Sequence, residues 1–341
     1  MSMKKILGFV VLTAALVVFS LWGLGNAQTA DMKMTQLTLL TSKFGRTSYI
    51  QGFALGEVLN KHSKWLRATA EETGGSSDNV KLGEQSPESR KSSLMVVSET
   101  PYKQAVKGEK PFDKPHPNLK IVCTGLTAVH FFGSLDPKIK TYQDMIGKKI
   151  AVGPKTDPHG IKGGDQIEFC HGILDKVKMS YMPAPDIPDA MVDGMVDVGY
   201  LTINPGYPKW MKDQPLEALA ARKKVYPIPL PPDQATKAMT NPKIRSVFNV
   251  VPFPANILFE GQPATTESAS FIYWCAYDDC PEDAVYEVLK MFYEHQREFV
   301  EHHALMGGLV PDKLGVGDFK EAELHKGALK FFKEKKLKIG L

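Results

Sequence analysis

The chain has 341 residues, of which 42 are Lys or Arg and 38 are Asp or Glu, giving a formal net charge of +4. These charges form no basic block and no interleaving of basic with aromatic residues, which argues against a nucleic-acid partner. The length exceeds what a single hydrophobic core usually supports, so we expect two lobes.

The N-terminus has the pattern of a secretory signal peptide. Lys4 and Lys5 precede an apolar run over residues 6–24, and Gly25-Asn26-Ala27 places small residues where a signal peptidase reads the chain. We therefore expect residues 1–27 to be a signal peptide that is removed after Ala27. The apolar run is also long enough to span a bilayer, so a retained membrane anchor is the alternative.

Short strand-like runs then alternate with helical patterns, which is typical of βα units and parallel sheets. The first set of strands is predicted at residues 36–41, 66–72, 94–98 and 119–123. Thr47 or Ser48 is expected to cap a helix that buries Ile50, Phe53, Ala54 and Val58 on one face. A short helix is expected near Asn79, and the polar, proline-containing residues 103–118 are interpreted as a surface loop.

A second set of elements begins near residue 128. Strands are predicted at 149–152, 178–183, 196–201 and 269–277, and helices at 142–146, 165–174, 187–193, 281–305 and 324–335. Residues 227–263 are rich in proline and resist assignment. The order of elements indicates an α/β protein.

The sequence offers little catalytic chemistry. It lacks G-x-S-x-G, H-E-x-x-H, P-loop and G-x-G-x-x-G motifs, so we predict no enzyme, no cofactor and no metal. Four cysteines, Cys123, Cys170, Cys275 and Cys280, lack metal-ligand spacing. Cys275 and Cys280 are close enough in sequence to form a local disulfide, with buried free thiols as the alternative.

Three short polar loops between strands and helices favour ligand binding. They cover residues 43–48, 73–79 and 155–160, and the first contributes the cations Lys43 and Arg46. In open α/β sheets, ligands bind beyond the carboxyl ends of strands, where helix N-termini offer free N–H groups and partial positive charge. The alternative is that Ser, Thr and Gly in these loops only cap helices and form turns.

Five motifs follow one another along the chain, at residues 44–49, 72–76, 142–153, 189–200 and 324–328. Their order resembles that of the TAXI class of solute-binding proteins of TRAP (tripartite ATP-independent periplasmic) transporters. Residues 44–49 (FGRTSY) resemble that family's Gly-Gly-Thr-Tyr-Tyr segment, and residues 72–76 (ETGGS) resemble its second loop. Residues 142–153 (YQDMIGKKIAVG) resemble its D-L-x-G-K-x-V-x-V-G element, and residues 189–200 (DAMVDGMVDVGY) resemble D-A-L-x-x-G-x-I-D-A. Residues 324–328 (LHKGA) resemble L-H-x-G-A, so the resemblance runs over nearly the whole chain after the signal segment.

The resemblance implies a two-lobed periplasmic-binding-protein-like fold (type II), in which each lobe is a mostly parallel sheet flanked by helices. Residues 34–126 and 274–341 would form lobe I and residues 127–273 lobe II, with hinge strands near 127–132 and 268–273. The ligand would bind between the lobes in the periplasm, and TRAP-type membrane permease subunits would receive it. The expected ligand-binding residues are Lys43, Arg46, Thr47, Ser48, Gly75, Ser76 and Ser98 on one wall, and Lys155, Thr156, His159 and Asn204 on the other.

The sequence departs from the family pattern where the ligand would bind. Arg46 and Ser48 replace a Gly and a Tyr, and residues 156–160 replace a Gly-Ser-Gly-Thr-like loop. Two loop cations without a neighbouring carboxylate favour a small organic anion, such as a carboxylate or amino acid. A neutral or amine-bearing solute held by Asp157 and His159 remains an alternative, as do a ligand-sensing subunit and a periplasmic enzyme with Ser76 beside His159.

Overall fold

The computed structural model describes residues 34–44, 47–155, 158–206, 209–212 and 214–341. The predicted signal peptide, Arg46 and Thr156 lie outside the described residues. Within the described residues, no helix is both long enough and apolar enough to span a membrane.

The described strands form one continuous sheet whose main path runs β2-β1-β3-β11-β4-β7-β5-β6. Their bounds are β1 (Thr35–Leu40), β2 (Leu66–Glu71), β3 (Ser93–Ser98), β4 (Leu119–Ser134), β5 (Lys149–Val152), β6 (Lys178–Tyr181), β7 (Val198–Asn204), β8 (Met211–Lys212), β9 (Tyr226–Ile228), β10 (Asn249–Phe253) and β11 (Thr265–Tyr277). β1 and β3 are parallel, as are β5 with β6 and β5 with β7. The sheet therefore has two mostly parallel ends, which we call the first half (β1–β3) and the second half (β5–β7).

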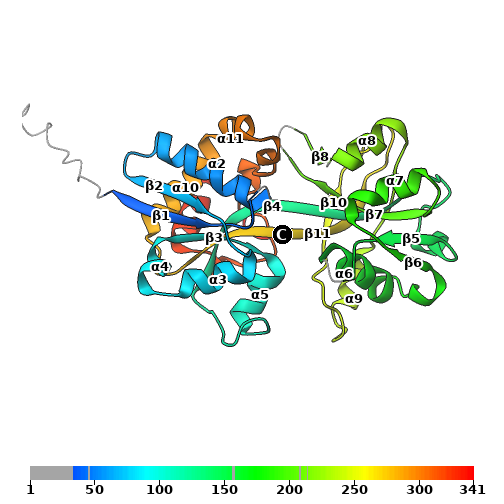
Figure 1. Ribbon diagram of the computed structural model, residues 1–341, viewed down its shortest axis with the longest axis horizontal. Coiled ribbons are helices and arrows are strands. Elements are labelled where there is room, and N and C mark those ends of the chain that lie inside the picture. Colours follow the sequence, from blue (N-terminus) through cyan, green and yellow to red (C-terminus); the bar gives the residue numbers. More distant parts are fainter. Residues whose placement is uncertain (1–33, 45–46, 156–157, 207–208, 213) are drawn as a thin grey trace, which may run out of the picture. The chain divides into compact units, whose positions relative to one another are not determined.

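Helices flank both halves of this sheet. Their bounds are α2 (Thr47–His62), α3 (Ser76–Glu84), α4 (Pro87–Ser92), α5 (Glu99–Lys107), α6 (Pro158–Asp165), α7 (Ile187–Val192), α8 (Gln214–Arg222), α9 (Pro232–Ala238), α10 (Glu282–Glu294), α11 (Gln296–His302) and α12 (Lys326–Lys335). In Figure 1, α2 and α11 cover one face of the first half, and α3, α4 and α5 cover the other. This layered arrangement confirms the predicted α/β class.

Two long antiparallel strands, β4 and β11, connect the halves. β11 pairs with β3 from Ile272 to Cys275, while β4 pairs with β7 from Val129 to Ser134. The two strands pair with each other along most of their length. They are buried on both faces over most of their length, which explains apolar runs such as residues 271–277 of β11.

α2 packs unusually close to the first half of the sheet. A Cβ on Gly52 would come within 2.4 Å of the Thr41 side chain, and one on Gly56 would lie 3.3 Å from the Ala68 carbonyl oxygen. Glycine at these positions lets the helix approach β1 and β2. The predicted buried face is wrong at Phe53, which is 51% exposed, because Gly52, Leu55 and Gly56 face the sheet instead.

Three local predictions are corrected by the structure. The expected loop over residues 103–118 begins as α5, which continues to Lys107 and ends at Gly108 with a positive φ of 74°. The single helix expected over residues 281–305 is two helices, because His295 takes a non-helical backbone conformation between α10 and α11.

The expected disulfide is also wrong, since all four cysteines are free and buried. Cys275 lies inside β11, which continues to Tyr277, whereas Cys280 lies beyond the following turn, where its N–H donates to the Tyr277 carbonyl. Burial raises the pKa of the Cys280 thiol to about 12, so it is protonated at neutral pH.

Candidate functional site

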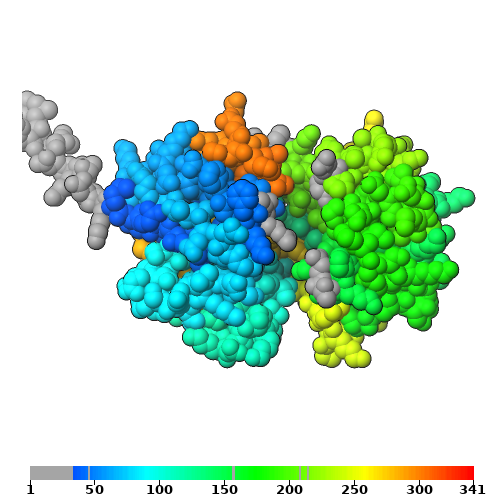
Figure 2. Space-filling view, viewed as in Figure 1, coloured from blue at the N-terminus to red at the C-terminus, as the bar shows by residue number. Residues whose placement is uncertain are grey.

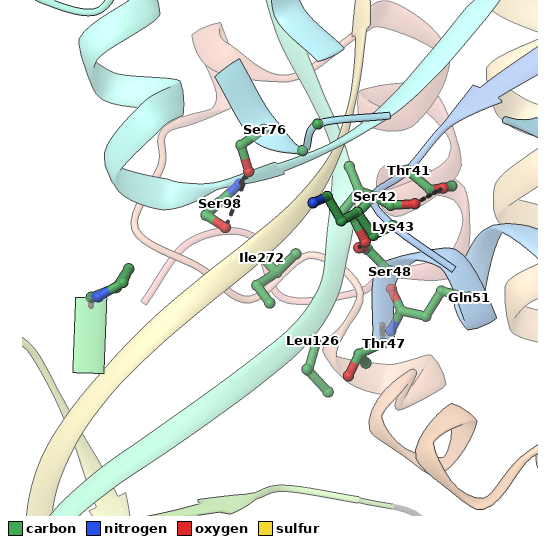
Figure 3. Close-up of a pocket in the computed structure, with 14 residues that line it drawn as sticks. Thr41, Ser42, Lys43, Thr47, Ser48, Gln51, Ser76, Ser98, Leu126 and Ile272 are labelled. Carbon is green, nitrogen blue, oxygen red and sulfur yellow. Dashed lines mark hydrogen bonds between the residues drawn. The ribbon is translucent and has the colours of Figure 1, made fainter. Parts of the chain in front are cut away.

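A pocket of about 520 Å³ opens at the edge of the first half, where β1 and β3 end. Because β1 and β3 are parallel, the loops that follow them meet at one edge. Its lining residues are Thr41, Ser42, Lys43, Thr47, Ser48, Gln51, Gly74, Gly75, Ser76, Val96, Ser98, Leu126, Pro158 and Ile272. Figure 3 shows that hydroxyl groups from separate loops face this space.

The loops that form the pocket are held together by Asn79, which is completely buried. Its side-chain nitrogen donates to the carbonyl oxygens of Thr41 at 2.7 Å and Val96 at 2.8 Å, and so ties the end of β1 to β3. Thr73 donates to the Asn79 oxygen at 2.6 Å and accepts the N–H of Gly75 at 3.1 Å. These bonds fix the shape of the loop that carries Gly75 and Ser76.

Gly75 adopts a backbone conformation that other residues avoid. Its φ of 105° and ψ of −160° fall in a region that is essentially restricted to glycine. This turn starts α3 at Ser76 and brings the N-terminus of that helix to the pocket. The Gly74-Gly75-Ser76 motif therefore has a structural role in shaping the pocket.

Two pairs of serines link neighbouring loops around the pocket. Ser42 and Ser48 share a short hydroxyl–hydroxyl hydrogen bond. Ser76 donates to the Ser98 hydroxyl at 3.3 Å and accepts the Ser98 N–H at 3.0 Å. Gln51 reaches from the first turns of α2 to the Gly125 carbonyl at 2.9 Å. These contacts hold polar groups in place around the pocket, beside apolar lining residues such as Val96 and Leu126.

The electrostatic environment of the pocket favours negative charge. Three helices, α2, α3 and α5, begin at its edge, and their first N–H groups have no partner within the helix. Lys43 adds a full positive charge. None of the described residues that line the pocket is acidic, and within the described part of the chain Lys43 forms no ion pair.

The structure brings together most of the residues expected on the first wall. Lys43, Thr47, Ser48, Gly75, Ser76 and Ser98 all line the pocket, whereas Arg46 lies outside the described residues. The remaining lining residues were not predicted from the sequence: Thr41, Ser42, Gln51, Gly74, Val96, Leu126, Pro158 and Ile272. Ser42 and Gln51 could have been predicted as lining residues, because both are polar and flank the first loop at residues 43–48. Leu126 and Ile272 come from β4 and β11, and their convergence depends on the tertiary fold.

Among the described residues, those expected on the second wall do not line this pocket. The Lys155 ammonium group lies 4.6 Å from the centroid of the Tyr181 ring. His159 packs against the rings of His130 and Tyr200, with centroids 5.8 and 4.9 Å away. Asn204 ends β7 and pairs with Met211. Thr156 lies outside the described residues, and Pro158 is the described lining residue contributed by the second half.

A second cation, Lys162 of α6, is buried between the second half and β11. Its ammonium group donates to the carbonyl oxygens of Val247 and Ala269 and to the Ser270 hydroxyl, at 2.7 to 2.8 Å. Burial lowers its pKa to about 8. Nearby, the buried carboxylate of Glu99, at the start of α5, accepts two hydrogen bonds of 2.8 Å from Asn249 of β10. These polar groups have internal partners and take no part in the pocket.

The fold is that of two-lobed α/β binding proteins. A solved structure of a TctC solute-binding protein from Polaromonas, without ligand, superimposes with a TM-score of 0.54, at 10% identity over 82% of this chain and 90% of that chain. Lower TM-scores are found with the periplasmic aliphatic sulphonate-binding protein SsuA from Escherichia coli (0.42, 14% identity, 81% and 78% covered). The same holds for R. palustris Rpa4515 with adipate (0.43, 13% identity, 78% and 87% covered).

The family follows from the sequence itself. The chain belongs to the NMT1-like family, whose model matches residues 39–335. A search of curated protein sequences finds no match. The finer resemblance to the TAXI class is not part of this finding.

Proposed function

We propose that this protein is the periplasmic solute-binding subunit of a membrane transporter and that it captures a small organic anion. The observation that carries the proposal is the pocket, which combines Lys43, three helix N-termini and several hydroxyl groups without an acidic lining residue. Such a site stabilises a carboxylate through charge-assisted hydrogen bonds. The protein would carry out no catalytic step, and the Ser76 hydroxyl donates its hydrogen bond to Ser98 rather than to a histidine.

The ligand would bind between two lobes that are connected by β4 and β11. We place lobe I at residues 34–126 and 274–341 and lobe II at residues 127–273, with hinges near 127–132 and 268–273. Leu126 and Ile272 line the pocket next to these hinges, which supports this placement. Contacts that a ligand makes with both lobes would favour a closed form that the membrane subunits recognise.

The transporter would be of the TRAP type, on the strength of the motif resemblance described above. Such a system uses an ion gradient and no ATP. The gene neighbourhood tests this part separately, because a multi-spanning TRAP permease gene beside this one supports it. An ATPase gene in that place would contradict the TRAP assignment and leave solute binding intact.

The ligand class is tested by calorimetry and thermal unfolding on the chain without residues 1–27. Mono- and dicarboxylates, amino acids, amines and neutral solutes are screened for a rise in melting temperature, which a ligand of the native state produces by mass action. We expect a carboxylate to be the solute that stabilises the protein. A stabilising ligand that is neutral or cationic would contradict the proposal.

Lys43→Met provides the direct test of the anion site. Losing one charge-assisted hydrogen bond costs about 1.5–3 kcal/mol, so the Kd for the carboxylate should rise roughly 10- to 100-fold. Lys330→Met is the matched control, because Lys330 of α12 is exposed and its ammonium group lies over the Tyr286 ring, away from the residues that line the pocket. An unchanged Kd in Lys43→Met would show that this cation does not hold the ligand.

A further inference from the structure

Three potential metal ligands converge at the opposite end of α2 from the pocket. His62 lies at the last position of α2, His295 lies between α10 and α11, and Glu298 lies in the first turn of α11. Their ligand atoms all lie within 4.8 Å of one another. Figure 1 and Figure 2 show α2 and α11 side by side at the surface of the first half.

The distances within this cluster suit a single small cation. The Glu298 Oε2 atom lies 2.7 Å from His62 Nε2 and 3.8 Å from His295 Nδ1. Two ligands of a tetrahedral Zn²⁺ ion, each about 2.0–2.2 Å from the metal, are separated by about 3.4 Å. The two observed distances lie on either side of this value, so small side-chain rotations would bring all three atoms onto one ion.

The carboxylate of Glu298 already has the orientation that a metal site needs. Its Oε1 atom accepts a hydrogen bond of 2.7 Å from the Lys61 ammonium group, while its Oε2 atom faces both histidines. Lys61 can therefore keep its hydrogen bond to Oε1 when Oε2 binds an ion. Partners of this kind orient the ligands of metal sites.

Both histidine rings face the same carboxylate oxygen, Glu298 Oε2, and lie against each other. The rings of His62 and His295 are stacked, with centroids 3.9 Å apart.

We propose that His62, His295 and Glu298 form a binding site for a borderline divalent cation such as Zn²⁺. Two imidazole nitrogens and one carboxylate oxygen are a zinc-type ligand set, and water would fill the fourth position. The nitrogen ligands disfavour Ca²⁺ and Mg²⁺, which prefer oxygen. A bound ion would join the C-terminus of α2, the helix that presents Thr47 and Ser48 to the pocket, to the α10–α11 junction.

The test uses the untagged chain without residues 1–27 and zinc chloride alone. Calorimetry should show one Zn²⁺ per chain, and the melting temperature should rise with Zn²⁺ and return with EDTA. His62→Gln and His295→Gln should each raise the Kd for Zn²⁺ at least 10-fold, whereas His303→Gln, outside the cluster, should change it less than twofold. Binding that is absent in the wild type, or equal in both cluster variants and the control, overturns the proposal.

Cobalt gives a second measurement that needs no variant. Co²⁺ in a tetrahedral site of nitrogen and oxygen ligands absorbs strongly in the visible range, and Zn²⁺ should displace that signal in a 1:1 ratio. A weak, octahedral-type spectrum would overturn the proposed geometry. Mg²⁺ in excess should leave the Co²⁺ spectrum unchanged, and displacement by Mg²⁺ would contradict the proposed ligand set.

Discussion

Lys43 and Lys162 show two opposite ways in which this protein accommodates a positive charge. Lys43 is exposed at the edge of the first half, faces a pocket without acidic lining residues and forms no ion pair with a described residue. Lys162 is buried beside the second half and donates to three internal acceptors. A lysine therefore indicates a ligand site only when the fold leaves its ammonium group without acceptors.

The largest effect is expected from Lys162→Met. This change leaves two buried carbonyl oxygens and the Ser270 hydroxyl without their donor, so the free energy of unfolding should fall by about 3 kcal/mol. Urea denaturation at neutral pH measures it. A loss smaller than about 0.5 kcal/mol would mean that water replaces the ammonium group and that the contrast with Lys43 is false.

A smaller, pH-dependent effect is expected from His171 in the second half. Burial lowers its pKa to about 4, against an ordinary value of 6.5. Because the folded-state pKa is depressed, the contribution of the neutral ring is complete above pH 6.5 and is lost as the pH falls towards 4, by roughly 3 kcal/mol at most.

The comparison of wild type with His171→Gln isolates the pH-dependent contribution of His171 to the free energy of unfolding. The wild-type protein should lose stability relative to the variant between pH 6.5 and 4, as measured by urea denaturation at several pH values. His302→Gln, at an exposed position, should follow the wild type over the same range. If the free energy of unfolding of wild type and of His171→Gln changed in parallel with pH, water would have to reach the His171 ring at acidic pH.

The smallest effect on stability is expected from Lys43→Met, the same substitution at the exposed cation. Its free energy of unfolding should differ from wild type by less than about 0.5 kcal/mol, because no described partner loses a contact. Denaturation without ligand, run beside Lys162→Met, measures it. A loss as large as that of Lys162→Met would show that Lys43 supports the fold rather than a ligand.

The parts of the molecule that could be predicted from the sequence depend on local patterns. The strand at residues 149–152 and the loops that carry Lys43, Gly75 and Ser98 follow from alternation, glycines and capping residues. The helix break at His295 escaped prediction because the apolar periodicity continues across it. The buried position of Lys162 could not be predicted, because its hydrogen-bond acceptors come from residues 247, 269 and 270, far away in the chain.

The course of β11 also determines the order in which the chain can fold. β11 comes late in the sequence, yet Ile272 pairs with Ser98 of β3 and Ser268 pairs with His130 of β4. Pairings between distant segments slow folding, because the long intervening chain must be ordered before they form. A chain still being synthesised can shape the loops around Asn79 early, but the pocket lacks Ile272 until β11 arrives. The proposed binding site is therefore completed only at a late stage of folding, when most of the polypeptide is already in place.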